Sequence, residues 1–233
     1  MSKDSYKIDM CNGPVLPKVI AFSLPLMLSS CLQLLFNAAD VIVVGRFAGS
    51  SSLAAVGSTT TIINLLTNLF IGFSIGANVN VARTIGNQDE QGTQDNVHTA
   101  VSVSLISGIA LVIIGVLTAR PFLTWMGTPD DIIGKATLYL TIIFIGMPSN
   151  MAYNFGSSIL RAMGDTKRPL YFLSAAGVLN IILNLIFVIL FRMDVAGVAL
   201  ATILSETLSA VLILGCLCRS EERRVGKECR SRW

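Results

Sequence analysis

The chain has 233 residues, of which 53% are hydrophobic and only 13% are charged. A soluble domain is typically about 25% charged, so this composition excludes an ordinary soluble enzyme or nucleic-acid-binding module and indicates a polytopic membrane protein. The formal net charge of +3 comes from residues 219–233, which contain six Lys/Arg and three Asp/Glu. The rest of the chain has eleven of each and implies no nucleic acid or acidic partner.

Six apolar segments are long enough to cross a lipid bilayer, which takes about 17–25 residues in a helix. They predict an all-α fold with six transmembrane helices near Val15–Val44, Leu53–Val81, Val97–Ala119, Ile132–Phe155, Leu170–Phe191 and Val195–Leu217. The first segment is too long for the apolar core of a cleaved signal peptide, and five more follow it. The connecting loops are short, so we expect no soluble domain.

The first span contains an ionisable group. Asp40 lies in an otherwise apolar stretch, and Gln33 and Asn37 precede it by seven and three residues, so the three share one helix face. A carboxylate at the centre of a spanning helix costs roughly 2.5–3.5 kcal/mol on insertion scales, and such residues usually face a bundle interior or a water-filled cavity. We therefore expect Asp40 to function in transport, with Gln33 and Asn37 as cavity-lining candidates.

Two prolines fall inside predicted spans, Pro25 in the first and Pro148 in the fourth. Each removes one backbone hydrogen bond and can kink its helix. A static kink and a functional bending point are both compatible with the sequence. Pro25 is the hinge candidate.

Polar residues recur at a spacing of four within the spans, which stacks them on one helix face. For Asn64/Asn68 and Asn150/Asn154 we favour hydrogen bonds that join neighbouring helices, and we expect the second span, which is rich in Thr and Asn, to be buried in the bundle. The same spacing occurs at Asn180/Asn184 and Thr202/Glu206.

The fifth and sixth spans are joined by a very short turn, so they must be antiparallel neighbours. Asn180, Asn184 and Thr202 can therefore form one polar cluster. Glu206 is the third cavity-lining candidate. It is the only carboxylate besides Asp40 inside a span, and it lies nearer the middle of its span than the end.

The basic residues predict the orientation, because cytoplasmic loops carry an excess of Lys and Arg. With the N-terminus in the cytoplasm, the inner segments hold Lys3, Lys7, Lys18, Arg83, Arg161, Lys167 and Arg168, and the outer ones hold Arg46, Arg120, Lys135 and Arg192. We expect a multi-pass protein of the cell membrane with a cytoplasmic N-terminus. Neither nucleophile–base nor metal-ligand spacing occurs, so we expect no enzyme activity, no metal and no organic cofactor.

The last segment, Arg219–Trp233 (RSEERRVGKECRSRW), has no apolar periodicity. It matches, residue for residue, the translation of a widely used sequencing-adapter read. A genuine basic tail at a cytoplasmic membrane edge is the alternative. We expect a non-native tail, and we divide the chain into an N-terminal cytoplasmic segment (1–14), a six-helix lobe (15–218) and this tail (219–233).

Four stretches resemble the multidrug and toxic compound extrusion (MATE) family of secondary transporters. They are Ser23–Gly57 with Asp40, Gly72–Gly92 (GFSIGANVNVARTIGNQDEQG), Ile159–Leu170 (ILRAMGDTKRPL) and Val178–Glu206. The resemblance covers about residues 14–218. It implies the N-terminal six-helix lobe of a twelve-helix, two-lobe transporter, in a chain that stops where the inter-lobe linker would begin and lacks the C-terminal lobe.

The resemblance also implies a function. Family members export cationic or amphipathic small molecules across the lipid bilayer in exchange for protons or sodium ions. Asp40 would be the carboxylate of the ion-coupling site in this lobe, and its neighbours there would be Asn180, Asn184, Thr202 and Tyr139. Some relatives have aspartate where this chain has Asn184, which leaves the coupling ion open between H+ and Na+. Pro25 matches a proline that lets the first helix bend.

Two alternatives remain open at this point. A lipid-linked saccharide flippase of the same superfamily usually lines its cavity with several Arg or Lys, and no basic residue lies mid-span here. A non-transporting membrane scaffold would not need Asp40 and Glu206, because neither is required for packing. Both observations favour the antiporter, and we expect the single lobe to be inactive without its partner lobe.

Overall fold

The computed structural model describes residues 14–231, with side chains as far as Arg219. Every regular element in this part of the chain is helical. The elements are α1 (Val15–Val43), η1 (Val44–Ala48), α2 (Ser50–Gly86), α3 (Glu90–Trp125), α4 (Asp130–Ile145), α5 (Met147–Ala162), α6 (Lys167–Leu185), η2 (Ile186–Leu190) and α7 (Asp194–Ser231), where η marks a π-helical segment. Within the described residues, five helices are long and apolar enough to cross a membrane, and a sixth span results if the bent pair α4–α5 is counted as one.

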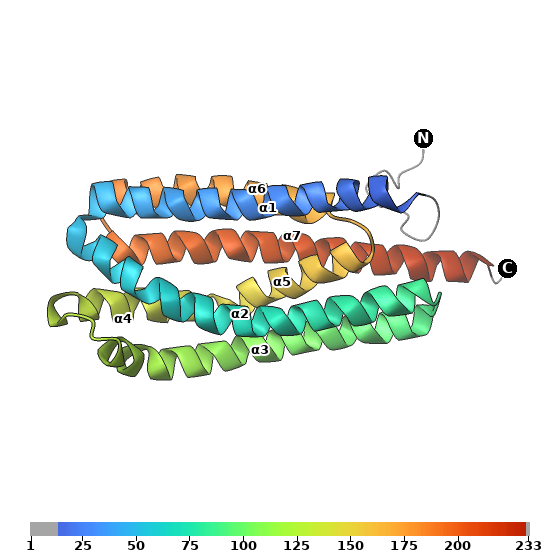
Figure 1. Ribbon diagram of the computed structural model, residues 1–233, viewed down its shortest axis with the longest axis horizontal. Coiled ribbons are helices and arrows are strands. Elements are labelled where there is room, and N and C mark those ends of the chain that lie inside the picture. Colours follow the sequence, from blue (N-terminus) through green and yellow to red (C-terminus); the bar gives the residue numbers. More distant parts are fainter. Residues whose placement is uncertain (1–13, 232–233) are drawn as a thin grey trace.

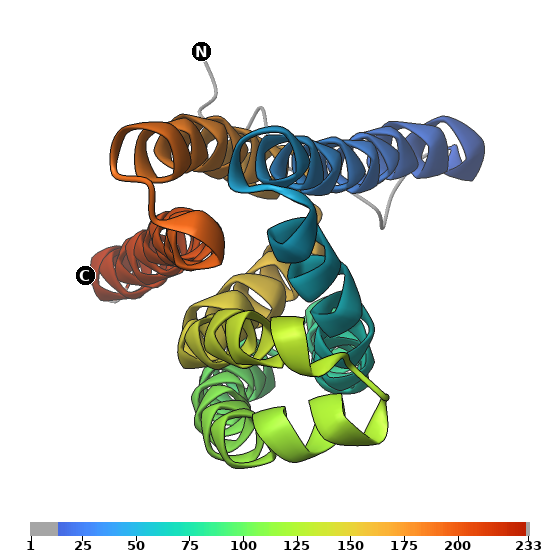
Figure 2. The same ribbon diagram turned by 90° about the vertical axis from the view of Figure 1, so that its left-hand side faces the viewer.

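The helices form one elongated bundle with turns at its two ends (Figure 1). One end carries the start of α1 and the α2–α3 and α5–α6 turns, and we call it the N-terminal end. The other carries the α1–α2, α3–α4 and α6–α7 turns, and we call it the Lys135 end. Viewed along the bundle, α1 and α6 lie side by side in one layer, α2 to α5 form the opposite part, and α7 lies beside α6 (Figure 2). The predicted all-α fold is confirmed, and the five or six apolar helices follow the predicted order.

The fourth span is broken near its centre. Helices α4 and α5 meet at an angle of 47° around Gly146, and Pro148 occupies the first turn of α5. Proline is tolerated in a first turn because the N–H group that it lacks would have no helical partner there. The predicted kink at Pro148 is therefore present, whereas α1 continues through Pro25 without a break.

The interior of the bundle is formed by α3, α4 and α5, where glycines allow close helix contact. A Cβ atom on Gly108 of α3 would lie 2.6 Å from the Cα atom of Pro148, and one on Gly115 would meet the ring of Phe144. Leu111, between them on α3, and Phe144 are almost fully buried. Small residues at such positions are typical of membrane helices, whose association depends on close packing.

Helix α1 lies outside this interior and packs mainly on α6. At their contact, a Cβ atom on Gly177 would meet the ring of Phe36. The other faces of α1 expose large apolar side chains, among them Leu24, Leu34 and Ile42, as a lipid-facing helix requires.

One expectation from the sequence is wrong. Helix α2 was expected to be buried because of its polar residues, but Asn64 and Asn68 are exposed and make no hydrogen bond to any residue in the described part of the chain. Only Thr59 of the Thr59–Thr61 run is buried, where its hydroxyl donates to the carbonyl of Val56 at 2.7 Å. The amide pair therefore does not join helices within this lobe.

Helix α7 continues to Ser231, so its backbone extends into the segment that we expect to be non-native. The side chains from residue 220 on lie outside the described residues, as do Lys3 and Lys7. The described basic residues used for the orientation group as expected, with Arg83, Arg161 and Lys167 near the N-terminal end and Arg46, Lys135 and Arg192 near the other.

Candidate ion-coupling site

The predicted polar cluster forms where α1, α6 and α7 meet. Asn184 on α6 donates from Nδ2 to Oδ1 of Asp40 on α1 at 2.5 Å. The same nitrogen contacts Oδ1 of Asn180 at 3.1 Å, and Nδ2 of Asn180 reaches Oγ1 of Thr202 on α7 at 3.5 Å. Four of the five residues predicted for the site thus form one connected chain of hydrogen bonds.

Local structure explains how these side chains come together. Asn180 and Asn184 are one turn apart on α6 and share a face. The close contact at Gly177, one turn before Asn180, brings α1 near enough for Asp40 to reach that face. The turn of Phe191–Met193 returns the chain as antiparallel α7, which places Thr202 opposite Asn180.

The cluster is shielded and its charge has no basic partner. Asn184 is fully buried and Asn180 nearly so, while Asp40 is partly buried. No Lys or Arg among the described residues lies within ion-pair distance of Asp40. In addition, Oδ1 of Asn184 is buried without a hydrogen-bond partner. A buried, unpaired acceptor next to a carboxylate can be satisfied by a proton donor or a cation.

Tyr139, the fifth predicted residue, is buried on α4. Among the described residues no hydrogen bond connects its hydroxyl to Asp40. The structure therefore does not join Tyr139 to the chain of hydrogen bonds.

The remaining candidates on α1 are arranged differently from Asp40. Gln33 and Asn37 are exposed and have no hydrogen-bond partner in the described part of the chain. Pro25 lies within the helix, and its carbonyl accepts a hydrogen bond from the hydroxyl of Ser29 at 2.9 Å. Asp40 is therefore directed to α6, while the other two polar residues of the predicted stripe face outward from this lobe.

Glu206 forms a separate polar contact between α5 and α7. Asn150 donates from Nδ2 to its Oε1 at 2.8 Å, and Asn154 donates to Oδ1 of Asn150 at 2.8 Å. The predicted interhelical role of Asn150 is confirmed, and its partner is a carboxylate.

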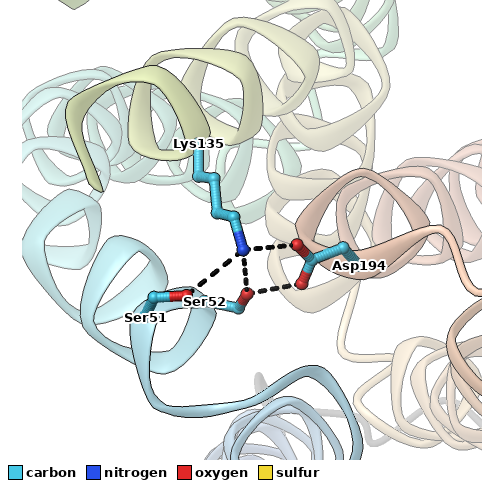
Figure 3. A network of polar contacts seen from close by, with 4 residues as sticks. All are labelled: Ser51, Ser52, Lys135 and Asp194. Carbon is cyan, nitrogen blue, oxygen red and sulfur yellow. Dashed lines mark hydrogen bonds and ion pairs between the residues drawn. The ribbon is translucent and has the colours of Figure 1, made fainter. Parts of the chain in front are cut away.

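Sequence reasoning missed a network at the Lys135 end (Figure 3). Lys135 of α4 forms an ion pair with Asp194 at 2.7 Å and donates to the hydroxyls of Ser51 and Ser52 at 3.2 and 3.1 Å. Ser52 also donates to Asp194. Three helices, α2, α4 and α7, are joined by these contacts. The sequence signal was weak, because the four residues come from the early turns of three helices that are far apart in the sequence.

A cavity of about 390 Å³ lies beside this network. Its lining comes from both π-helical segments and the α6–α7 turn, through Phe47, Ala48, Val188, Ile189, Arg192 and Asp194. Val44 is one turn from Asp40, Val188 is one turn from Asn184, and both valines are buried. The cavity is therefore separated from the Asp40 cluster by apolar side chains.

Chemically, the Asp40 cluster offers one carboxylate, two amides and a hydroxyl in a partly dehydrated place between helices. Such a set can take up a proton on the carboxylate or surround a small cation with oxygen ligands.

Comparison with known proteins agrees with this geometry. The sequence profile of the MatE family matches residues 25–186. The chain is 33% identical over 198 residues to a probable multidrug resistance protein, YpnP, of Bacillus subtilis, covering 85% of this chain and 44% of that protein. It is 26% identical over 207 residues to the multidrug export protein MepA of Staphylococcus aureus, covering 87% of this chain and 45% of MepA.

The fold is shared with solved transporters. A structure described as the outward-facing conformation of a multidrug resistance MATE family transporter of the MOP superfamily matches with a TM-score of 0.84 at 28% identity, over 91% of this chain and 47% of that one. The chain thus spans less than half the length of the relatives that it matches. The chain belongs to the MatE family, whose members are multi-pass membrane transporters and not enzymes.

Proposed function

We propose that the chain is the N-terminal lobe of a secondary antiporter that exports cationic or amphipathic compounds in exchange for protons or sodium ions. The observation that carries the proposal is Asp40, a carboxylate in a spanning helix that has two amides and a hydroxyl around it and no basic partner in the described part of the chain. A charge of this kind is costly in the membrane, and charges in spanning helices therefore usually have a function.

The proposed mechanism is differential binding. A protonated or ion-bound Asp40 has less need of the Asn184 donor than an ionised Asp40, so the two states favour different positions of α1 against α6. A ligand shifts such an equilibrium only by its difference in affinity for the two states. Ion and exported compound would therefore stabilise different states of the lobe, and alternating access would follow from movement of two lobes around the site.

A second lobe is part of the proposal. Polar side chains on α1 and α2 (Gln33, Asn37, Asn64 and Asn68) are exposed on this lobe, and such groups are costly against lipid. A cavity between two lobes would hydrate them. We further propose that the N-terminal end faces the cytoplasm of a cell-membrane protein, because the excess of basic residues lies there.

The test begins with the gene. Reading the locus again from source DNA beyond the codon for Cys218 should give a further helical lobe in place of Arg219–Trp233. If the clean read encodes the same fifteen residues, the tail is native, and this result contradicts the proposal that a second lobe follows Cys218.

The second step uses that complete protein in everted membrane vesicles. Asp40→Asn should insert normally, because it removes a desolvation cost, and it should abolish ion-driven uptake of a fluorescent organic cation. Asp95→Asn makes the same chemical change at an exposed position on α3 and should leave uptake unchanged. Uptake by Asp40→Asn vesicles at the wild-type rate under the same ion gradient would show that Asp40 is a packing residue.

Residues 1–218 alone, expressed in a drug-sensitive host, should give no resistance, whereas the complete gene should. Resistance from the single lobe that persists when it is shown to be monomeric would contradict the need for a second lobe.

A further inference from the structure

A second carboxylate lies in the membrane-spanning part of the lobe, apart from the Asp40 cluster. Glu206 is on α7, one turn beyond Thr202 toward the N-terminal end. It is twelve residues from the start of α7 at Asp194, or about 18 Å along the helix, which is well inside a hydrocarbon core of about 30 Å.

The amide that holds Glu206 is itself oriented. Asn154 donates to Oδ1 of Asn150 at 2.8 Å, which leaves Nδ2 of Asn150 to donate to Oε1 of Glu206 at 2.8 Å. A further hydrogen bond links α5 to α2, since the hydroxyl of Ser74 donates to the backbone carbonyl of Asn154 at 3.2 Å. The carboxylate is thus a fixed acceptor whose supporting amides come from α5.

Glu206 has no compensating positive charge. In the described part of the chain no Lys or Arg lies within ion-pair distance of it, and no hydrogen bond reaches its second oxygen, Oε2. The residue is partly exposed. Beside it, the hydroxyls of Ser149 and Thr207 are 3.0 Å apart at an exposed position on the same α5–α7 contact. The open oxygen therefore lies along a polar contact that reaches the surface of the lobe.

Glu206 lies one helical turn from the Asp40 cluster along α7. Thr202, whose hydroxyl is contacted by Asn180, is the last residue of that cluster, and residues four apart on a helix share a face. A charge at Asp40 and a charge at Glu206 are therefore on the same side of α7.

We propose that Glu206 receives the positively charged group of the exported compound, while Asp40 takes the coupling ion. This inference rests on the proposed function. It assigns the charge of the exported compound and the charge of the coupling ion to separate positions. An ionised Asp40 adds to the attraction that Glu206 exerts on a cation. An ion bound at Asp40 removes that contribution, so the compound is released when the ion binds, which is the sign of coupling that antiport requires.

The test is equilibrium binding of tetraphenylphosphonium to the purified complete protein, with triphenylphosphine oxide as a neutral probe of similar shape. Glu206→Gln keeps the size of the side chain and removes its charge. We expect the Kd for tetraphenylphosphonium to rise about tenfold or more, as the loss of one charged partner implies, with an unchanged Kd for the neutral probe. The matched control is Glu90→Gln, at the exposed start of α3, which should change neither.

Two further variants separate a binding role from a structural one. Glu206→Asp should restore part of the cation affinity, and Asn150→Leu should weaken it because the carboxylate loses its orienting donor. Equal loss of both probes in Glu206→Gln, or no loss of either, overturns the proposal. So does a Glu206→Gln protein that binds the cation normally but has lost ion-driven release, because Glu206 would then be an ion site.

The role of Asp40 can be tested separately from that of Glu206. In Asp40→Asn, tetraphenylphosphonium should still depend on Glu206 for binding, but adding the coupling ion should no longer displace it. If the ion still displaces the cation from Asp40→Asn, the proposed role of Asp40 fails while the assignment of Glu206 stands or falls on its own variants.

Discussion

The contact between α1 and α6 differs in kind from the interior formed by α3, α4 and α5. In the interior, Gly108 lies against the backbone of Pro148 and Gly115 against the buried ring of Phe144. At the α1–α6 contact, Gly177 lies against the partly buried Phe36, and the next contact is the polar one between Asn184 and Asp40.

Burial follows the same division. In the most apolar window of α3, 33% of the residues are buried, against 11% in α1. The helix that carries the ionisable group is therefore among the least enclosed, and part of what holds it is a hydrogen bond that depends on charge. The more enclosed interior gives the lobe its shape, and a helix that is packed on one face only can respond to the state of one carboxylate.

The largest difference should appear when an aromatic ring is removed from each contact. Phe144→Ala should lower the free energy of unfolding by about 3–5 kcal/mol, because the ring is fully enclosed. Phe36→Ala should cost about 1–2 kcal/mol, since its ring is only partly buried. Unfolding of the detergent-solubilised protein measures both. Equal losses would mean that α1 is packed as firmly as the interior.

A smaller difference should follow when a methyl group is added to the glycines. Gly108→Ala pushes against the backbone of Pro148, which cannot move aside, and should cost about 1–3 kcal/mol. Gly177→Ala pushes against the partly buried ring of Phe36 on a helix with exposed outer faces, so we expect less destabilisation and an outward shift of α1, measured by the distance between spin labels on α1 and α6. Gly76→Ala, with nothing within 4 Å of the added atom, is the control and should be neutral or slightly stabilising. An unshifted α1 in Gly177→Ala would argue against a mobile contact.

The network at the Lys135 end should contribute less than either packing contact. The Lys135 and Asp194 side chains are 39% and 37% exposed, and ion pairs of this kind are worth about 0.2–1 kcal/mol. Lys135→Met should therefore cost no more than this, and the cost should shrink in high salt. A larger loss of thermal stability that does not depend on salt would show that the network stabilises the lobe as much as the interior packing does.

The smallest effect on stability is expected on the outer face of α2. Asn64→Leu and Asn68→Leu remove exposed amides that bond to no described residue, so unfolding of the single lobe should change by about 0.5 kcal/mol or less. In the complete protein the same variants should impair transport if this face lines a cavity. Strong destabilisation of the single lobe would restore the original expectation that these amides join helices within it.

The sequence predicted the spans well, because a run of about twenty apolar residues has few alternatives to a transmembrane helix. It also predicted the kink at Pro148 and the meeting of Asn180, Asn184 and Thr202, since a very short turn forces α6 and α7 together. The meeting of Asp40 with Asn184 came from family resemblance, because the sequence does not show which helix α1 packs against.

Other features depend on packing that periodicity does not encode. The exposure of Asn64 and Asn68 was missed because a polar helix face has the same pattern whether it meets a neighbouring helix or a space outside the lobe. The Lys135–Asp194 pair was missed because charges near the start of a helix usually face water. Among the candidates on α1, shared helix phase alone did not distinguish Asp40, which bonds to Asn184 on α6, from Gln33 and Asn37, which are exposed.

The π-helical segments that follow α1 and α6 have a consequence for motion. Val44–Ala48 and Ile186–Leu190 begin four and two residues after Asp40 and Asn184. A π-turn holds one residue more than an α-turn, and this surplus residue can be passed along a helix without breaking it. Passing it across Asp40 would rotate that side chain by about 100°, the angular step of one residue, while the ends of the helix stay in place. The carboxylate could then leave Asn184 by a local change of winding, without tilting the whole of α1.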